Sequence, residues 1–308
     1  MKTPRWFLKR NLTALVLWPA SLFYYMGSRF VFNCRKKHEY VSRRPLICFG
    51  NILAGGVGKT PIVRSVAKIF DAPVVMRGYK KTKETSNIGD EAKMLSNDGI
   101  LVHVGDRKSN LILLNKQKSN TPILMDDGFQ NSSIKKNISV LVFDEGIGFG
   151  NRFLLPAGPL REPVSAIRRA DAIIVIKRDR VADGFALPTS MPIFYAKNRE
   201  ICPYNKQTRV VVFAGIGYPE KFFDAVPADV VGKRAFPDHY QYSDDDIKDL
   251  IKFAESNKAK LLTTEKDWVR LPAWAQKQIK FSKLDTEIQS DFYNWITEKI
   301  NDINHKKS

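Results

Sequence analysis

The stretch Asn51–Pro61 reads NILAGGVGKTP; it follows the apolar run Leu46–Phe49 and leads into the helix-like run Ile62–Phe70. Glycines let such a loop curl so that its backbone N–H groups point inward. The lysine then reaches the β- and γ-phosphates of a nucleotide, and the threonine hydroxyl binds Mg²⁺. The following helix directs the positive end of its dipole at the same anion. This order of strand, glycine-rich loop and helix predicts a P-loop.

The loop departs from the pattern G-x-x-x-x-G-K-[ST] at one position. Leu53 stands where the pattern has its first glycine, and two glycines follow it closely. A glycine-rich turn without a ligand is the alternative, but the order of the elements favours phosphate binding. The residues expected to bind ATP are Gly55, Gly56, Val57, Gly58, Lys59, Thr60 and Pro61.

Composition is that of a globular protein, with 44% hydrophobic and 27% charged residues in a chain of 308, enough for one large or two medium domains. The net charge of +18 indicates an anionic partner: nucleic acid, acidic lipid or a phosphorylated substrate. Half of that excess lies in residues 1–44, which hold ten lysines and arginines against one acid, Glu39. The remainder is only modestly basic, which disfavours a nucleic-acid partner.

The basic clusters of residues 1–44 flank an apolar, aromatic run, Leu12–Gly27. Its 16 residues are fewer than the roughly 20 needed to cross a bilayer, and Pro19 interrupts it. A secretory signal is disfavoured because no convincing cleavage site follows. We expect residues 1–40 to be a helical segment lying in or on a membrane, with its cations on anionic head groups. A buried core helix with a basic surface is the alternative.

Strand-like and helix-like runs alternate after the P-loop. This alternation predicts a parallel sheet with helices on both faces, and continuous apolar runs are typical of strands buried on both sides. The pattern pauses at Asn198–Thr208, after which a second βαβαβ series begins. We predict an α/β protein resembling the P-loop NTPases, with a membrane-associated segment 1–44, a P-loop kinase domain 45–204 and a smaller α/β domain 205–308. The expected strands before the pause are Ala72–Gly78, Ile100–Gly105, Thr121–Asp127, Ile138–Asp144 and Asp171–Arg178.

Three other patterns carry no predicted site. Gly146–Asn151, GIGFGN, lacks the G-x-G-x-x-G spacing of a dinucleotide site. Thr263–Asp267, TTEKD, lacks the residue between lysine and aspartate that a guanine-reading N-K-x-D motif has, so a GTPase is disfavoured. The three cysteines show no disulfide or metal-ligand spacing, which agrees with free thiols in a reducing compartment.

Asp126 and Asp127 end the apolar run that begins at Ile123. In P-loop enzymes an acid where such a strand meets its loop holds Mg²⁺. Because adjacent strand residues point to opposite faces, only one of the pair is expected to reach the metal. An Asp-Asp-Gly turn is the alternative.

Two further residues are candidates for acid–base chemistry. Asp90 opens a helix-like run, where the usual role of an aspartate is to cap the helix; a kinase, however, needs a base near the acceptor hydroxyl. His239 follows Asp238 in a loop, and the carboxylate could orient the imidazole. From the sequence, His239 could have either of two roles, capping a helix or taking part in catalysis.

The segment Asn151–Pro163, NRFLLPAGPLREP, combines three prolines with an Ala-Gly-Pro turn and Arg161. It is typical of a rigid loop that presents a guanidinium, and arginine suits bidentate contact with phosphate. A merely structural proline loop is the alternative.

These residues resemble one family, the tetraacyldisaccharide 4′-kinases, which phosphorylate the lipid A precursor. Seven landmarks occur in family order and cover about residues 46–270. They are GNILAGGVGKTP, RGY (Arg77–Tyr79), GDE (Gly89–Glu91), DDGFQ (Asp126–Gln130), LLPAGPLREP (Leu154–Pro163), FPDH (Phe236–His239) and TEKD (Thr264–Asp267). The shift of the first glycine is itself similar to the family's loop.

The resemblance implies transfer of the γ-phosphate of ATP, with Mg²⁺, to the 4′-hydroxyl of an acylated disaccharide 1-phosphate, a membrane lipid. It also implies work at the cytoplasmic face of the inner membrane of a Gram-negative-type bacterium, with neither nucleic acid nor an obligate protein partner. A membrane-associated nucleotide-switch ATPase that acts on a protein partner is the alternative function.

The resemblance also implies roles for individual residues. Lys59 would hold phosphates, and Asp90, helped by His239, would take the proton from the acceptor hydroxyl. Metal contacts would come from Thr60, Asp126, Asp127 and Glu162. Substrate contacts would come from Tyr79, Glu91, Arg107, Gln130, Asn131 and Arg161. Asn131 and Tyr240 stand where the family usually has histidines, so the groups available for substrate contact at these two positions differ from the family's.

Overall fold

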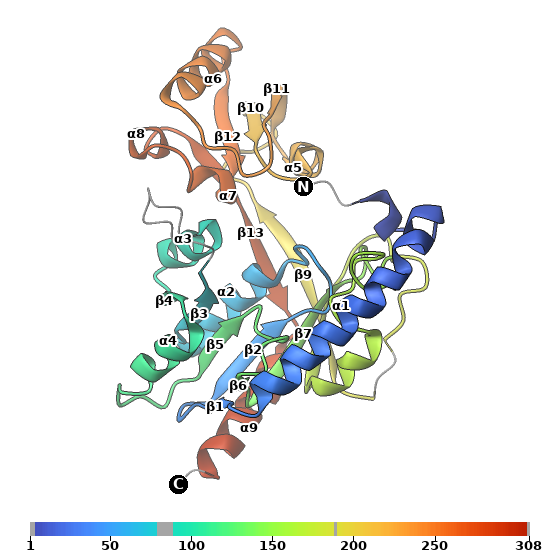
Figure 1. Ribbon diagram of the computed structural model, residues 1–308. Helices are drawn as coiled ribbons and strands as arrows, with labels where there is room; N and C mark the ends of the chain where they lie inside the picture. Colours follow the sequence, from blue (N-terminus) through green and yellow to red (C-terminus); the bar gives the residue numbers. More distant parts are fainter. Residues whose placement is uncertain (1–3, 79–88, 188–189, 307–308) are drawn as a thin grey trace. The chain divides into compact units, whose positions relative to one another are not determined.

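The computed structural model describes residues 4–78, 89–187 and 190–306 (Figure 1). They form two compact units, each considered by itself. The small unit consists of Gly89–Asn97 and Arg199–Asp285, and the P-loop unit of the other described residues. The domain boundary expected near residue 204 stays a prediction about folding domains, but the C-terminal segment from Thr286 belongs to the P-loop unit rather than to the small unit.

The P-loop unit is built on a parallel sheet. Its strand order is β9-β8-β7-β2-β5-β3-β4, and β2 (Leu46–Gly50), which precedes the P-loop, lies between β5 and β7. The other bounds are β3 (Val74–Arg77), β4 (Val102–Gly105), β5 (Ile123–Asp126), β7 (Ile138–Asp144), β8 (Ala172–Ile176) and β9 (Ile193–Ile201), the last belonging to this unit up to Asn198. Strands β1 (Tyr40–Val41) and β6 (Ile134–Lys135) form a separate pair. The predicted parallel sheet is confirmed.

Helices cover both faces of this sheet. Cys48 of β2 packs with Leu111 of α4 (Arg107–Leu114), whereas the neighbouring Phe49 stacks edge-on against Phe292 of α9 (Ser290–His305), 6.5 Å between ring centroids. Neighbouring strand residues point to opposite faces, so α4 and α9 lie on opposite sides of β2. Helix α2 (Lys59–Phe70) begins at the P-loop lysine.

The N-terminal region is a short 3₁₀ turn, η1 (Arg5–Phe7), followed by one helix, α1 (Leu12–Lys36), which continues through Pro19. Among its described residues only small ones are buried, Ala14 and Ser21. The Ser21 hydroxyl donates to the carbonyl oxygen of Leu154 (2.9 Å) and accepts from the Ala157 N–H (3.2 Å). Small side chains thus hold α1 against the proline loop.

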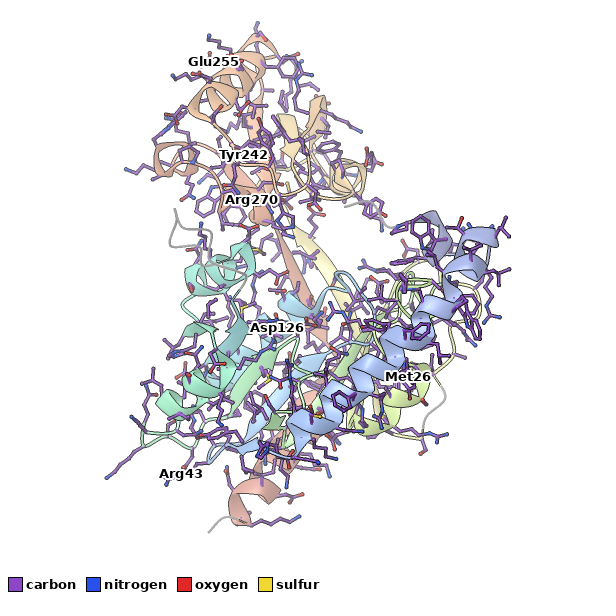
Figure 2. All side chains as sticks on the ribbon, viewed as in Figure 1. Met26, Arg43, Asp126, Tyr242, Glu255 and Arg270 are labelled. Atoms are coloured by element: carbon purple, nitrogen blue, oxygen red, sulfur yellow. The ribbon has the colours of Figure 1, made fainter. Side chains whose placement is uncertain are left out.

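The outward side of α1 is apolar. Figure 2 labels one of these side chains, Met26. The large exposed apolar residues of the helix are Leu12, Leu15, Val16, Trp18, Leu22, Phe23, Tyr24, Met26, Phe30 and Val31. Within the described ranges, none of the helices combines the length and hydropathy needed to span a bilayer.

The small unit repeats the layered architecture. Its strands are parallel in the order β11-β10-β12-β13, with bounds β10 (Arg209–Ala214), β11 (Asp229–Ala235), β12 (Lys260–Thr264) and β13 (Lys280–Ile288), the last belonging to this unit up to Asp285. Val211 and Phe213 of β10 pack under α6 (Asp244–Ser256) and α8 (Ala273–Gln276). Val210 and Val212 face α5 (Pro219–Ala225) instead. The short helix α7 (Glu265–Trp268) contacts α3 (Asp90–Asn97), which comes from a distant part of the chain.

One sequence expectation differs from the structure. The pause predicted at Asn198–Thr208 begins inside strand β9, which continues to Ile201. Residues along β9 alternate between less and more exposed positions, so polar residues occupy its open side and no continuous apolar run marks it.

Candidate active site

The P-loop takes a conformation that its glycines permit. Gly55 and Gly58 have positive φ angles of 109° and 77°, which other L-residues rarely adopt. Gly58 is also the N-cap of α2, so Lys59 and Thr60 occupy the first turn of that helix. The loop therefore places backbone N–H groups and a helix N-terminus where an anion binds.

Leu53, the residue that breaks the P-loop pattern, has a structural role. It is buried and forms a β-bridge with Leu160 in the proline loop. Backbone hydrogen bonds on either side reinforce the contact: the Ala54 N–H donates to Pro159 (2.7 Å), and the Arg161 N–H donates to Ile52 (2.7 Å). The P-loop and the proline loop are thus fixed to each other through Leu53, the position that departs from the pattern.

Asp127 lies between two cations. Lys59 Nζ is 3.2 Å from its Oδ1, and Arg161 Nη1 is 3.0 Å from its Oδ2. Burial alone would raise the pKa of Asp127, but the charges and hydrogen bonds of Lys59 and Arg161 outweigh burial and lower that pKa. Lys59, Asp127 and Arg161 therefore lie together beside the P-loop, and the two cations favour the ionised form of the carboxyl.

Asp126 ends β5 and is buried opposite Phe49 of β2. Arg107, itself buried, donates from Nη2 to the carbonyl oxygens of Asp126 (2.7 Å) and Asp127 (3.0 Å). Burial lowers the pKa of Arg107. Its guanidinium holds the backbone of the acidic pair in place.

The residues predicted to bind Mg²⁺ suit that ion. The part of the chain that the structure describes contains no group of three or more His, Cys, Asp or Glu side chains able to hold a metal. Mg²⁺ usually needs fewer, because it binds one or two carboxylates together with substrate phosphates and water. The Thr60 hydroxyl in the first turn of α2 and the carboxylates of Asp126 and Asp127, at and just after the end of the strand paired with β2, are groups of the kind that such a site uses.

Gln130 and Asn131 make local contacts. Gln130 Nε2 donates to the Asn51 carbonyl oxygen (2.8 Å), which links it to the start of the P-loop. Asn131 Oδ1 accepts from the N–H (2.9 Å) and the hydroxyl (2.7 Å) of Ser133. Asn131 thus stabilises its own turn.

Glu162 precedes the 3₁₀ segment η2 (Val164–Arg169), and its Oε2 pairs with Arg169 Nη2 at 2.5 Å. Its Oε1 is buried and has no hydrogen-bond partner among the residues described. Arg169 also lies over the rings of Phe32 and Phe129, 4.9 and 4.6 Å from their centroids. Glu162 is therefore oriented through one oxygen only.

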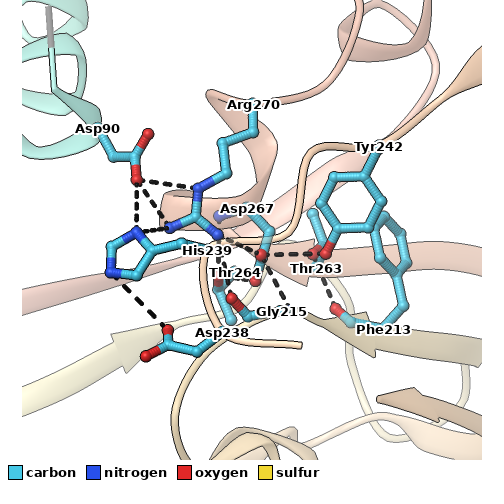
Figure 3. A network of polar contacts seen from close by, with 10 residues as sticks. All are labelled: Asp90, Phe213, Gly215, Asp238, His239, Tyr242, Thr263, Thr264, Asp267 and Arg270. Carbon is cyan, nitrogen blue, oxygen red and sulfur yellow. Dashed lines mark hydrogen bonds and ion pairs between the residues drawn. The ribbon is translucent and has the colours of Figure 1, made fainter. Parts of the chain in front are cut away.

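The second cluster lies in the small unit and centres on Asp90, the first residue of α3 (Figure 3). Its Oδ2 accepts from Arg270 Nε (2.9 Å) and Nη2 (2.7 Å), and His239 Nδ1 is 3.4 Å from the same oxygen. Partial burial alone would raise the pKa of Asp90, but the hydrogen bonds and charge of Arg270 outweigh it and lower that pKa. Asp90 and His239 are brought together as expected.

His239 lies in a strained, exposed loop. Its φ is 62°, and its N–H donates to the Gly215 carbonyl oxygen (3.0 Å). Its Nε2 is 3.9 Å from Asp238 Oδ1. The neighbouring Tyr240, where the family usually has a histidine, donates its hydroxyl hydrogen to Asp246 (3.2 Å) and packs on nearby aromatic rings. Tyr240 therefore has a packing role.

The remaining predicted residues are less defined. Glu91 is exposed on α3 beside Asp90, and Tyr79 lies outside the described residues. Arg270 was missed at the sequence level, because the TEKD motif ends at Asp267 and a later arginine carries no signal of its own. The structure shows it to be a principal partner of Asp90.

Comparisons with known proteins agree with this geometry. Residues 13–301 match the family model described as tetraacyldisaccharide-1-P 4′-kinase. The tetraacyldisaccharide 4′-kinase of Paramagnetospirillum magneticum is 36% identical over 300 residues, covering 89% of this chain and 90% of that protein. The enzyme of the same name from Maricaulis maris is 35% identical over 259 residues, 76% of each chain. The crystal structure of LpxK from Aquifex aeolicus in complex with ATP has a TM-score of 0.77 at 25% identity and covers 95% of this chain and 99% of that one.

Proposed function

Since the chain belongs to the tetraacyldisaccharide 4′-kinase family, we propose that its P-loop cluster binds ATP and that the cluster around Asp90 accepts the proton of the acceptor hydroxyl. The chain is an ATP-dependent kinase of lipid A biosynthesis that phosphorylates the 4′-hydroxyl of a tetraacyldisaccharide 1-phosphate. A nucleotide switch acting on a protein partner is not favoured, because the family and its curated members are kinases.

We assign ATP to the P-loop cluster. The N–H groups of residues 55–60 and the Lys59 ammonium bind its phosphates, as the positive-φ glycines and the N-terminus of α2 support. Thr60 and one carboxylate of the Asp126–Asp127 pair would hold Mg²⁺, and Glu162 would support them. When bound, Mg²⁺ neutralises charge on the β- and γ-phosphates. Lys59 is paired with Asp127 in this structure, so binding a phosphate would require this lysine to exchange one anion for another.

We assign the acceptor proton to Asp90. As the acceptor oxygen bonds to the γ-phosphorus and the bond to the leaving ADP oxygen breaks, the hydroxyl proton passes to the Asp90 carboxylate. His239, whose Nδ1 lies 3.4 Å from Asp90 Oδ2, assists this proton transfer. The observation that carries this assignment is geometric: the partly buried Asp90 carboxylate lies 3.4 Å from His239 and is held through Oδ2 by Arg270. Its lowered pKa keeps the carboxylate unprotonated at neutral pH, so that it can accept a proton.

We assign the anionic and polar parts of the disaccharide to Arg161, Gln130, Asn131 and Glu91. Arg161 is the strongest of these because its guanidinium is partly exposed while its backbone is bonded to the P-loop segment. Arg107 supports the site through the backbone of the acidic pair. Tyr79 is assigned from the resemblance alone.

We propose that α1 binds the cytoplasmic face of the inner membrane in a Gram-negative-type bacterium, where the lipid substrate lies. Phe23 and Phe30 are 75% and 71% exposed, and exposed aromatic and aliphatic side chains on one helix mark an interaction surface. The surrounding lysines and arginines suit anionic lipids. Neither nucleic acid nor an obligate protein partner is part of the proposal.

Asp90→Asn tests the assignment of the base. With labelled ATP and acylated disaccharide 1-phosphate, we expect the variant to bind ATP normally and to lose about 100-fold or more of its turnover, since general bases contribute about 10²–10⁴-fold. Asp246→Asn is the matched control: Asp246 lies in the same unit and is the N3 residue of the capping box of α6, so turnover should stay near wild type. Near-normal turnover in Asp90→Asn would show that Asp90 is not the base and has only a structural role.

A further inference from the structure

Arg270 is the most fully bonded buried cation of the small unit that the structure describes. Its side chain is 1% exposed, and all five of its N–H groups have partners. Nε and Nη2 donate to Asp90 Oδ2, Nη2 also lies 3.2 Å from His239 Nδ1, and Nη1 donates to the Gly215 carbonyl oxygen (3.0 Å) and Asp267 Oδ1 (3.1 Å). A guanidinium has five N–H donors in a fixed plane, so its orientation is determined.

We propose that Arg270 is a positioning residue of the phosphotransfer reaction: it aims the Asp90 carboxylate and fixes the tautomer of His239. The proposal rests on the proposed function of Asp90 as the proton acceptor. It also gives a role to the TEKD motif, whose aspartate holds the guanidinium from the opposite side (Figure 3).

Asp267 holds Arg270 rigidly. The carboxylate is completely buried, and its Oδ1 also accepts from the Gly215 N–H and the Tyr242 hydroxyl, each at 3.0 Å. Its Oδ2 accepts from the Thr264 hydroxyl at 2.7 Å. A buried carboxylate with this many donors has a fixed position, and so does the guanidinium that it binds.

Arg270 leaves one oxygen of Asp90 for chemistry. Both of its hydrogen bonds, and the close approach of His239, are at Oδ2. In the part of the chain that the structure describes, no donor contacts Oδ1, and the Asp90 side chain keeps 19% of its surface exposed. Oδ1 is therefore the atom that receives the acceptor proton, while Oδ2 holds the carboxylate in place.

The same guanidinium decides which nitrogen of His239 carries a proton. Because a guanidinium only donates, Nδ1 must accept from Nη2 while this contact lasts. The ring proton is then on Nε2, the nitrogen 3.9 Å from Asp238 Oδ1. His239 consequently does not donate from Nδ1 to Asp90 in this arrangement, and Arg270 is the group that neutralises the base.

The direct test is the pH dependence of turnover. Asp90 faces three basic groups, namely Arg270, Lys266 and His239 when protonated. We expect Arg270→Met to lower kcat by about 10- to 100-fold with an unchanged KM for ATP, and to move the acid limb of the kcat profile to higher pH, because the principal cation is lost. Arg270→Lys should recover part of both effects, since an ammonium keeps the charge but not the planar fork.

A matched control separates positioning from stability. Arg44 is also a buried guanidinium, 5% exposed, but it belongs to the P-loop unit and bonds to Thr121. Arg44→Met should lower thermal stability and leave the acid limb where it is. If Arg270→Met instead loses activity by the same factor at every pH, as Arg44→Met would through reduced folding, the proposal is overturned.

The double variant Asp90→Asn/Arg270→Met asks whether Arg270 acts through Asp90. The proposal expects it to be no slower than Asp90→Asn alone, whereas multiplying losses would contradict it. If Asp90→Asn turns over normally, the proposed function of Asp90 fails first; if Asp90→Asn is inactive but Arg270→Met keeps the wild-type pH profile, only the present proposal fails. Should Arg270→Met not fold, Arg270→Lys carries the test, and a wild-type kcat and acid limb in that variant would overturn the proposal.

Discussion

Asp90 and Asp127 belong to different units but follow the same electrostatic rule. For each, burial disfavours the charged carboxylate, and adjacent cations more than compensate, so the pKa of each is lowered. The partners differ in kind. Asp90 is held by a buried arginine that donates two hydrogen bonds, whereas Asp127 is shared by the P-loop lysine and a partly exposed arginine. The cation that binds Asp90 is therefore more deeply buried than those that bind Asp127.

The lowered pKa of Asp90 makes a prediction about stability against pH. Because the folded pKa lies below the unfolded value of about 3.9, the contribution of ionised Asp90 is fully present above pH 4 and is lost as pH falls through the folded pKa. We expect Asp90→Asn to lower the free energy of unfolding at pH 7 by about 1–3 kcal/mol, and the difference to shrink below pH 4.

Urea denaturation of the wild type and of Asp90→Asn between pH 7 and pH 3 measures the difference in their free energies of unfolding. Asp245→Asn is the control, since its carboxylate is 90% exposed and should change the free energy of unfolding little at any pH. A gap between wild type and Asp90→Asn that is constant over the whole range would contradict the linkage.

At the level of single residues, sequence reasoning found side chains that belong to motifs and missed those defined by tertiary contact. Lys59 and Asp127 could be predicted because the first belongs to the P-loop motif and the second follows an apolar run typical of a buried strand. Arg270 could not, because three of its four partners, Asp90, Gly215 and His239, are distant in the chain and most arginines are solvated. The role of Leu53 could not be predicted either, because it depends on a tertiary contact. Leu53 stands where the P-loop pattern has a glycine, and the structure shows that it forms a β-bridge with Leu160.

At the level of elements, buried strands were the easiest to predict and half-open ones the hardest. β7 and β8 are continuous apolar runs, buried throughout, and both were expected. β9 and β13 alternate exposed charged residues with buried ones, and neither was identified. Helix α9 carries buried Phe292, Ile296 and Ile300 on one side, a helical spacing that could have been used.

Helix α1 supports a prediction at the same scale. Phe23→Glu/Phe30→Glu replaces two exposed aromatic residues that make no contribution to the buried core, so the protein should fold normally. We expect its partitioning to anionic vesicles to fall by at least 10-fold, because a charge at the interface is costly and two apolar groups are lost. Co-sedimentation with vesicles measures this.

The matched control places the same charges elsewhere. Ile69 and Leu113 are exposed apolar residues on α2 and α4, and Ile69→Glu/Leu113→Glu should leave partitioning within about 2-fold of wild type if only electrostatic repulsion of two added acids acts there. Equal losses in the two double variants would show that net charge, rather than α1, governs binding.

For the whole molecule, the charge of +18 with its N-terminal excess predicts a salt-dependent association. Binding to anionic vesicles should weaken as salt rises from 0.1 to 1 M, because the screening length falls from about 10 to about 3 Å. Removing residues 1–40 should abolish most of the binding. Salt-sensitive binding to DNA together with indifference to anionic vesicles would revive a nucleic-acid partner.

The small unit has a further consequence, which concerns synthesis rather than catalysis. Asp90 and Arg270 are 180 residues apart in the chain, and a ribosome adds about 5–20 residues per second, so the aspartate is made about 10–40 s before its partner. During that time α3 has neither α7 nor the Arg270 guanidinium to hold it. A nascent chain can thus complete its P-loop long before it can align a proton acceptor, and the ability to transfer phosphate is among the last properties that the growing polypeptide acquires.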